Sequence, residues 1–319
     1  MTDTLYEYAL EDEYYELGGY SWIHFGERIA DKVAIAVKFS RESDPTTLAR
    51  FKLENKIMHE LKDIDYIVNA FTGVLHGYRT KARKHHYYVM EKADCSFSKW
   101  LELNSGVLTD KMRIEVLCGV FQGLIAIHER NYVHRDLHSE NVLMFKKLDE
   151  HIPKIADFGK AYDLSKGISL TRANKPAWGA ALTPPEILFG VIQHDDPAYK
   201  GGDFYAFGML IHTSFFLGLD GFSLLFDMHK SLDRFQRTKL PPGALTSNYF
   251  RLRSDEERLA DYKEWCQSEE DNVSDRYNVN RPHQRLNDII KATARLDYTK
   301  RVVDVSLIEN ELNLLRQEL

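Results

Sequence analysis

The sequence is poor in cysteine, and its few cysteines follow no pattern. Cys95, Cys118 and Cys266 are the only three in 319 residues, and none has the spacing of a metal site. Scattered cysteines of this kind exclude a disulfide framework and are typical of a reducing compartment. The sequence therefore predicts a cytoplasmic protein.

Long apolar runs and an excess of positive charge are also missing. The most apolar window, residues 204–219, contains Gly208 and His212 and falls short of the roughly 20 residues of a membrane span. Residues 1–8 are acidic and have no apolar stretch long enough for a signal peptide. A net charge of -6 gives no reason to propose nucleic acid or an anionic membrane surface as a partner. We expect a soluble protein that binds neither.

Groups suited to phosphate chemistry gather between residues 133 and 159. The stretch begins Val-His-Arg-Asp-Leu-His-Ser-Glu-Asn-Val-Leu and ends in Asp-Phe-Gly. Asp136 can accept a hydroxyl proton, and Asn141 with Asp157 can hold Mg²⁺ between nucleotide phosphates. Either short motif alone is common by chance, whereas the ordered pair is not. The alternative interpretation is an exposed polar loop.

These residues resemble the catalytic loop and the metal-binding loop of eukaryotic-type protein kinases. The resemblance covers about residues 13–318 and implies an α+β, bilobal fold. It places a small β-rich N-lobe with one helix at residues 1–91 and a larger, mostly helical C-lobe at residues 92–319. It also implies ATP and Mg²⁺, with Mn²⁺ as the alternative metal, and a protein substrate.

Residues 33–39 form an apolar run that is predicted to be a core strand. The residues alone leave Lys38 either as an edge lysine that reaches solvent or as a functional group. The resemblance implies that Lys38 binds the α- and β-phosphates and that Ala36 covers the adenine.

The segment that precedes this strand aligns with the family's glycine-rich loop. Gly18 and Phe25 keep positions expected to contact the nucleotide, but Tyr20 and Ile23 stand at two of the three glycine positions. Glycine lets backbone N–H groups approach phosphates without a Cβ in the way. We therefore expect a stiffened or displaced lid, with weak ATP affinity or slow turnover.

A helical pattern follows over residues 45–63. Glu54 lies 14 residues before Val68, the spacing of the family's lysine partner, and Glu60 is the solvated alternative. An ion pair between Lys38 and Glu54 is therefore expected to position the phosphate-binding amine.

The resemblance also predicts the adenine pocket. Met90 would stand at its rear, the backbone C=O of Glu91 and the N–H of Ala93 would meet the adenine, and Leu143 would form the floor. Short strands are predicted at residues 142–145 and 153–156.

Residues 157–186 resemble an activation segment. Ser165, Ser169 and Thr171 are candidates for phosphorylation, and Arg135 is the residue type that would pair with such a phosphate. The alternative is that each hydroxyl is an ordinary loop residue.

The remaining matches lie in the predicted C-lobe, where residues 110–130 have the pattern of a buried helix. Asp203 is expected to cap the catalytic loop, and Arg301 to form a buried salt bridge with Glu186.

An extra segment around residues 226–284 has no counterpart in the usual pattern. Within it, residues 253–270 read as an amphipathic helix with Leu259, Tyr262 and Trp265 on one side. We interpret it as solvent-facing decoration; a docking surface for a regulatory partner is the alternative.

Taken together, the sequence predicts a protein kinase that transfers the γ-phosphoryl of ATP to Ser or Thr hydroxyls, including its own. Asp136, Lys38 and His138 are the predicted catalytic residues. His138 stands where Ser/Thr kinases usually have lysine, which predicts a slower enzyme whose rate falls as His138 loses its proton. Gly179 replaces a threonine that faces Asp136. A nucleotide-binding pseudokinase scaffold and a small-molecule phosphotransferase are the alternatives.

Overall fold

The structure is a computed structural model that describes nine ranges of the chain. These are residues 7–17, 21–41, 45–80, 83–148, 150–165, 182–192, 197–215, 219–274 and 284–319. Several residues singled out in the sequence lie outside these ranges: Gly18, Tyr20, Ser169, Thr171 and Gly179.

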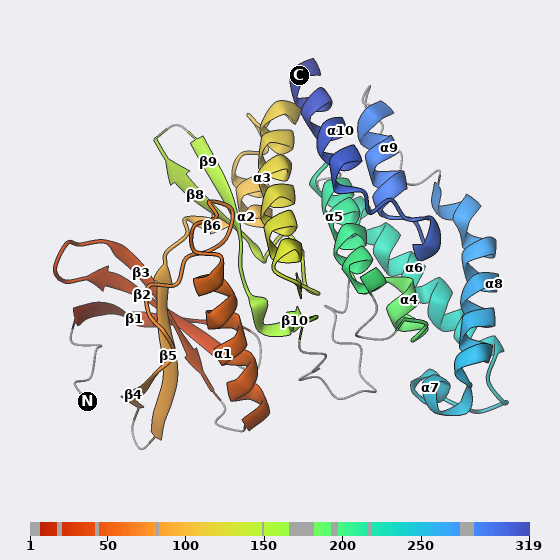
Figure 1. Ribbon diagram of the computed structural model, residues 1–319, viewed down its shortest axis with the longest axis horizontal. Helices are drawn as coiled ribbons and strands as arrows, with labels where there is room; N and C mark the ends of the chain where they lie inside the picture. The colour runs from red at the N-terminus through yellow and green to blue at the C-terminus, as the bar shows by residue number, and fades with distance from the viewer. Residues whose placement is uncertain are drawn as a thin grey trace.

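An antiparallel five-stranded sheet forms the smaller part of the molecule (Figure 1). Its order is β1-β2-β3-β5-β4, made by β1 (Tyr8–Leu17), β2 (Ser21–Arg28), β3 (Ala34–Ser40), β5 (Arg83–Glu91) and β4 (Leu75–Thr80). Side chains alternate along the central strand β3, so Val37 joins one apolar cluster and Ala36 joins another. Helix α1 (Pro45–Glu60) follows β3. The predicted strand and the predicted helix are both confirmed.

The larger part of the molecule is mainly helical. Its longer helices are α2 (Phe97–Leu103), α3 (Asp110–Glu129), α5 (Lys200–Phe215), α6 (Leu219–Thr238), α8 (Asp255–Ser274), α9 (Gln284–Thr293) and α10 (Val305–Glu318). Short turns of helix are α4 (Pro185–Leu188), α7 (Tyr249–Leu252), η2 (Phe158–Lys160), η3 (Pro197–Tyr199), η4 (Thr246–Asn248) and η6 (Tyr298–Lys300).

Helices α3 and α5 form the centre of this part. Thr109 caps α3 by accepting the N–H of Met112, and most side chains of α5 are buried. α3 packs against α5 and α10, and α5 packs against α9 (Figure 1). The buried helix predicted at residues 110–130 is thus confirmed.

Short strands connect the two parts around the loops that carry the predicted chemistry. β6 (Cys95–Ser96), β8 (Val142–Lys147) and β9 (Glu150–Ile155) form one small sheet, and β7 (Tyr132–Val133) pairs with β10 (Tyr162–Asp163). β8 and β9 confirm the two strands predicted on either side of residue 149. The polar loop before β8 and the Asp-Phe-Gly turn after β9 therefore emerge at the same end of this hairpin, next to the five-stranded sheet.

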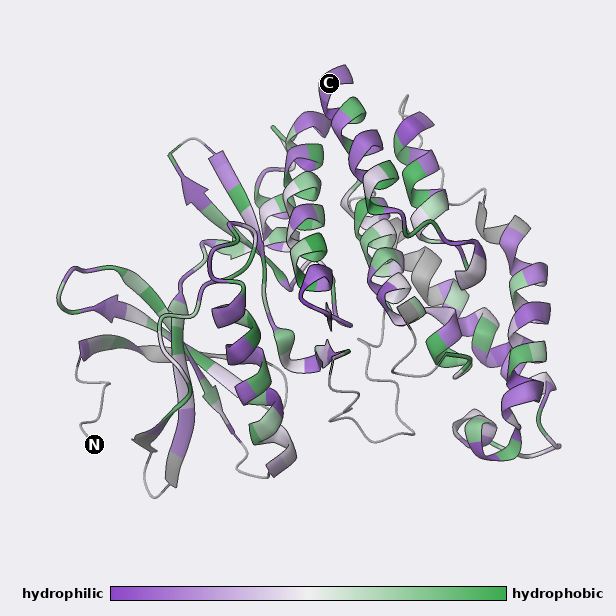
Figure 2. Ribbon diagram, viewed as in Figure 1, coloured by the Kyte–Doolittle hydropathy of each residue, from purple (hydrophilic) through white to green (hydrophobic). Residues whose placement is uncertain are grey.

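The interpretation of the extra segment as solvent-facing decoration is wrong for the inner face of α8. Tyr262 and Trp265 are each 1% exposed, whereas Leu259, predicted to share their side, is 36% exposed. Figure 2 shows purple, hydrophilic residues along much of α8, with a few green bands between them. The ring of Phe189 meets four aromatic rings from the extra segment: Phe235, Tyr249, Tyr262 and Trp265. The aromatic side chains of α8 therefore complete the core.

The architecture is an α+β fold in two parts, as the sequence predicts. Among the described residues, no helix is both long and apolar enough to span a bilayer.

Candidate active site

A cavity of about 520 Å³ opens between the sheet and the helical part, a size typical of small-molecule sites. Strands β2, β3 and β5, helix α1, the chain after β5 and the loop before β8 all contribute to it. The predicted nucleotide-binding residues that line it are Phe25, Ala36, Lys38, Glu54, Met90, Glu91, Ala93 and Leu143. Asn141 and Asp157 line it as well.

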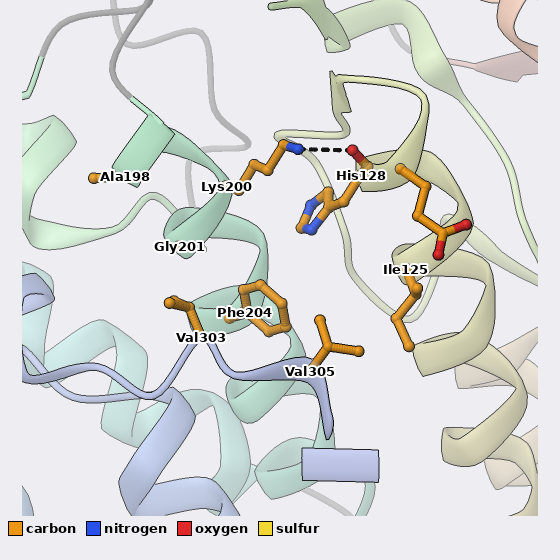
Figure 3. Close-up of a pocket in the computed structure, with 9 residues that line it drawn as sticks. Ile125, His128, Ala198, Lys200, Gly201, Phe204, Val303 and Val305 are labelled. Carbon is orange, nitrogen blue, oxygen red and sulfur yellow. Dashed lines mark hydrogen bonds between the residues drawn. The ribbon is translucent and has the colours of Figure 1, made fainter. Parts of the chain in front are cut away.

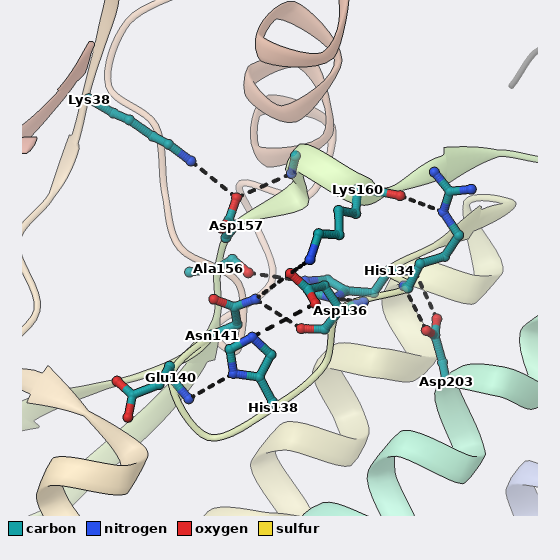
Figure 4. A network of polar contacts seen from close by, with 12 residues as sticks. Lys38, His134, Asp136, His138, Glu140, Asn141, Ala156, Asp157, Lys160 and Asp203 are labelled. Atoms are coloured by element: carbon teal, nitrogen blue, oxygen red, sulfur yellow. Dashed lines mark hydrogen bonds and ion pairs between the residues drawn. The ribbon is translucent and has the colours of Figure 1, made fainter. Parts of the chain in front are cut away.

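Lys38 joins the two parts of the molecule from the centre of β3. Its Nζ lies 2.6 Å from Glu54 Oε1 and 3.1 Å from Asp157 Oδ1, and Figure 4 shows the lysine reaching toward Asp157. Glu60 instead accepts a hydrogen bond from the hydroxyl of Tyr132 at 2.6 Å. The expected choice of Glu54 over Glu60 as the partner of Lys38 is confirmed.

The charges of Lys38, Glu54 and Asp157 depend on one another. Burial works against the charged form of Lys38, but the carboxylates of Asp157 and Glu54 outweigh it and raise the lysine pKa. Burial raises the pKa of Glu54 to about 7 against the pull of the Lys38 ammonium, and the hydroxyl of Tyr88 hydrogen-bonds to the same carboxyl group. Lys38 is therefore a firmly charged amine facing the cavity.

Asp157 adopts a backbone conformation that L-residues seldom take, with φ of 58°. Its Oδ1 accepts the N–H of Gly159 in addition to Lys38. Burial favours the neutral acid, but the charge of Lys38 outweighs it and lowers the pKa of Asp157. The next side chain, Phe158, is buried edge-on to the ring of His134 at 5.1 Å. The turn thus directs a carboxylate to the cavity and a ring into the core.

Asp203 of α5 holds the loop that carries Asp136. Its two oxygens accept the N–H groups of His134 and Arg135, each at 2.8 Å. The ring of His128 lies 2.9 Å from Asp203 Oδ2. The predicted cap is confirmed.

The two carboxylate oxygens of Asp136 have different surroundings (Figure 4). Asn141 Nδ2 lies 3.2 Å from Oδ2, and Lys160 Nζ lies 2.9 Å from the same oxygen. Oδ1 is buried and has no hydrogen-bond partner among the residues that the structure describes. His138 Nε2 is 3.8 Å from Oδ1, beyond hydrogen-bond range. Oδ1 is therefore the carboxylate oxygen whose capacity to accept a hydrogen bond no described residue uses.

Burial disfavours the charged form of His138. Burial lowers its pKa from the usual 6.5, against the attraction of Asp136. A lowered pKa means that the ring loses its charge below pH 6.5 as pH rises. The predicted fall in rate as His138 loses its proton is therefore expected below pH 7.

The oxygen donors of the site suit a cation that arrives with a nucleotide. Asn141 Nδ2 also donates to the C=O of Asp136 at 2.9 Å, which leaves the amide oxygen of Asn141 for a metal. No group of three or more His, Cys, Asp or Glu side chains arranged to hold a metal occurs in the described ranges. One amide and one carboxylate fit Mg²⁺, since phosphates and waters usually complete its shell.

Arg135, predicted to pair with a phosphate, is 2% exposed. Its Nε donates to the C=O of Lys160 at 2.5 Å, and its guanidinium lies 5.4 Å from the ring centre of Tyr162. Ser165 is exposed, and its hydroxyl donates to Asp163. The arginine is thus already bonded to the chain just after the Asp-Phe-Gly turn.

Two lysines at the site are not marked by any motif of their own in the sequence. Lys160 directly follows the Asp-Phe-Gly turn, and only its neighbouring motif could have drawn attention to it. Lys92 follows β5, and its Nζ lies 4.6 Å from the ring centre of Phe25 and 3.3 Å from Glu11 Oε1. Lys92 thus links β1 and β2 to the chain after β5.

A second cavity, of about 400 Å³, shares no lining residue with the first (Figure 3). It lies where the end of α3, the start of α5 and the chain before α10 meet. Lys200 donates to the C=O of His128 there at 2.7 Å. None of the predicted site residues lines it, so the candidate site is the first cavity.

The sequence model of the protein kinase domain matches residues 17–303. The chain belongs to the protein kinase domain family. The match spans both parts of the fold, so the bilobal architecture is that of a protein kinase domain.

Curated relatives include kinases of different specificity. Serine/threonine-protein kinase PknL of Mycobacterium tuberculosis is 29% identical over 198 residues, covering 61% of this chain and 46% of PknL. Tyrosine-protein kinase SYK of Gallus gallus is 29% identical over 59% of this chain and 28% of its own length. Cyclin-dependent kinase-like 4 of Homo sapiens is 29% identical over 52% of this chain and 41% of its own length. The chain thus matches less than half the length of each.

This protein kinase domain also contains the predicted buried salt bridge. Arg301 and Glu186 meet through two contacts, Nη1 to Oε1 at 2.5 Å and Nη2 to Oε2 at 3.0 Å. Their side chains are 1% and 0% exposed. The guanidinium further donates to the C=O groups of Gly201 and Arg295, so the pair is well bonded despite its burial.

Proposed function

We propose that this protein kinase domain transfers the γ-phosphoryl of ATP to Ser or Thr hydroxyls of a protein substrate, and to its own. The observation that carries the proposal is Asp136 Oδ1, a buried acceptor without a hydrogen-bond partner among the described residues. A substrate hydroxyl that donates to this oxygen would be oriented for attack and would pass it a proton.

The rest of the proposed machinery surrounds the phosphates. Lys38, positioned by Glu54, binds the α- and β-phosphates. Asn141 and Asp157 hold Mg²⁺, or Mn²⁺ in its place, and the metal neutralises and orients the phosphates when bound. His138 donates a hydrogen bond toward the transferred group. Positioning and charge neutralisation then supply most of the rate.

The adenine is proposed to lie at the inner end of the cavity. The C=O of Glu91 and the N–H of Ala93 meet its edge, while Met90, Ala36 and Leu143 enclose it; all five line the cavity. Gly18 and Phe25 are proposed to cover the nucleotide from the lid.

Two observations support serine and threonine as acceptors. Residues 137–141 lack the Ala or Arg that tyrosine kinases usually carry after the catalytic Asp, and PknL, a serine/threonine kinase, is among the relatives. We further propose an N-lobe at residues 1–91 and a C-lobe at residues 92–319. The free cysteines Cys95, Cys118 and Cys266 support a role in the cytoplasm.

The test measures phosphate incorporation from γ-labelled ATP with Mg²⁺ into the protein itself and into dephosphorylated casein. Asp136→Asn should lower the rate by about 10²- to 10⁴-fold with nucleotide binding retained, because it removes only the proton acceptor. Lys38→Met should lower both rate and nucleotide affinity. Asp233→Asn, which alters an exposed partner of Arg237, should change neither.

The same measurement separates the rivals. Nucleotide binding without any transfer by the unmodified protein would indicate a pseudokinase scaffold. Transfer to small hydroxyl compounds and not to protein would indicate a small-molecule phosphotransferase.

A further inference from the structure

The proposed reaction lacks one cation at its usual position in the catalytic loop. Residue 138 is histidine, and its Nε2 lies 3.8 Å from Asp136 Oδ1, too far for a hydrogen bond. Negative charge spreads over the transferred phosphoryl in the transition state. A cation near Asp136 would therefore accelerate the reaction, and His138 is poorly placed to supply it.

Lys160 brings a cation to this place from a different loop. Its Nζ lies 2.9 Å from Asp136 Oδ2, and its side chain is 43% exposed while that of Asp136 is 7% exposed. Figure 4 shows the amine reaching over the catalytic loop from the turn after Asp157. The ammonium is thus held at the edge of the site, with one side toward Asp136 and the other toward solvent.

The main chain of Lys160 is fixed to the catalytic loop. Its C=O accepts Nε of Arg135 at 2.5 Å, and the N–H of Arg135 is itself held by Asp203. The N–H of Ala161 donates to the C=O of Phe158 and closes the turn. The main chain of Lys160 and the loop that carries Asp136 therefore belong to one hydrogen-bonded network, unlike the two ends of an ordinary surface ion pair.

We propose that Lys160 is a catalytic residue that neutralises the transferred phosphoryl group, in place of the lysine missing at position 138. The inference rests on the proposed function. In the step, the substrate oxygen bonds to Pγ as the bond from Pγ to the β,γ-bridging oxygen breaks. The bond's electron pair leaves with ADP, and the hydroxyl proton passes to Asp136 Oδ1. Lys160 meets the charge on the equatorial oxygens of Pγ while it holds Asp136 Oδ2.

Two other roles would give the same contact. Lys160 could form an ion pair of little consequence, since exposed pairs contribute little. It could also be a latch that occupies Asp136 and restrains the enzyme. The three roles differ in the sign and kind of effect when the charge is removed.

The kinetic test compares Lys160→Met, which keeps length and loses charge, with Lys160→Arg, which keeps charge. Lys160→Met should lower kcat by about 10²- to 10³-fold, as does the loss of one transition-state donor elsewhere, with KM for ATP within about threefold. Lys160→Arg should retain most of kcat. The matched control is Lys239→Met, which removes a lysine paired with Glu264 on the far part of the helical lobe and should leave kcat unchanged.

Rescue distinguishes a catalytic charge from a structural one. Adding His138→Lys to the Lys160→Met protein should raise its kcat at least about tenfold, because the new lysine returns a cation to the same phosphoryl group. It should not rescue Asp136→Asn. A Lys160→Met protein with kcat within about threefold of normal would show an inconsequential ion pair, and one with raised kcat would show a latch; either result overturns the proposal.

A binding measurement makes the inference independent of turnover. Aluminium fluoride with ADP and Mg²⁺ imitates the planar phosphoryl, and titration calorimetry gives its effect on ADP affinity. It should tighten ADP binding to the normal protein at least about tenfold more than to Lys160→Met, with ADP alone bound equally by both. Equal effects on the two proteins, including no effect on either, would overturn the role of Lys160. Failure of the normal protein to transfer phosphate would overturn the proposed function, and this titration would still decide where Lys160 acts.

Discussion

The hydroxyl of Tyr88 contacts the ion pair between Lys38 and Glu54 on the side of Glu54. Tyr88 is 1% exposed, and its hydroxyl hydrogen-bonds to the carboxyl group of Glu54, whose other contact is Lys38 at 2.6 Å. Glu54 is therefore held from two sides. Because burial disfavours its charged form, the hydroxyl is part of what keeps the carboxylate in place.

We expect Tyr88→Phe to loosen Glu54 and to slow the reaction several-fold. Loss of one buried hydrogen bond should lower the free energy of unfolding by about 1–2 kcal/mol. The control is Tyr87→Phe, since Tyr87 packs in the cluster on the opposite face of the sheet. Kinase assays and urea unfolding check both. Equal loss of activity in the two variants would show that the hydroxyl of Tyr88 has no specific role in positioning Glu54.

The residues that the sequence could reveal are those fixed by spacing. Lys38 and Glu54 were predictable because the resemblance to protein kinases assigns a role to a lysine on this strand and to a glutamate 14 residues before Val68. Lys160 and Tyr88 were not, because their roles depend on where a long side chain turns in space. The side chain of a lysine after Asp-Phe-Gly could point to solvent as easily as it could point to Asp136. The turn that Arg135 holds in place directs the side chain of Lys160 toward Asp136.

At the scale of single elements, α5 is the support of the catalytic loop. Asp203 in its first turn accepts two N–H groups of the loop, and burial alone would raise its pKa. The hydrogen bond and charge of His128 outweigh burial and lower that pKa. A lowered carboxyl pKa means that the unfolded chain binds the proton more readily than the folded one. The stabilisation by Asp203 is thus present above about pH 4 and is lost as pH falls through the folded value.

Asp203→Asn should lower the free energy of unfolding by about 2–4 kcal/mol, because it weakens bonds to a buried charge. It should also flatten the acid side of the stability profile. Urea unfolding at pH 7, 5 and 3.5 measures both effects, with Asp233→Asn as the surface control. A variant whose stability falls with acid as steeply as that of the normal protein would contradict the assignment.

The elements themselves were largely predictable, with one instructive failure. Strand β3 and helices α1 and α3 have long, regular apolar patterns, and the structure has them where expected. Helix α8 lies where the sequence predicts a helix, but its buried face is narrower than the predicted apolar side. Leu259, Tyr262 and Trp265 share a helical stripe, yet only the last two reach the core, because Phe189 and its neighbours cover only part of the stripe. The periodicity of a sequence shows which residues share a face of a helix. It does not show how much of that face neighbouring side chains cover.

At the scale of the whole molecule, α1 links the sheet to the helical part. Glu60 Oε2 accepts the hydroxyl of Tyr132 at 2.6 Å, Lys56 donates to the same hydroxyl at 2.6 Å, and Arg130 donates to the C=O of Glu60 at 2.8 Å. These contacts tie one end of α1 to the strand that leads into the catalytic loop. Lys38 ties its middle, through Glu54, to Asp157. The geometry of the site therefore depends on how α1 is held.

The extra segment gives the helical part a core that extends well away from the site. Trp265 and Tyr262 of α8 pack with Phe189, just beyond the buried Glu186 that pairs with Arg301. The hydroxyl of Tyr262 donates to the C=O of Leu296 at 2.7 Å. If these rings are structural, their removal should destabilise the fold without a specific effect on phosphate transfer. Trp265→Ala should lower the free energy of unfolding by about 3–5 kcal/mol, because it leaves a large cavity.

Leu259→Ala on the same helix is the matched control. Its side chain is 36% exposed, so it should cost no more than about 1 kcal/mol. Urea unfolding gives the two values, and kcat measured well below the unfolding midpoint should stay near normal in both variants. A Trp265→Ala protein that unfolds like the control would show that α8 is dispensable decoration. A stable variant with a large loss of kcat would instead place this helix in contact with the protein substrate.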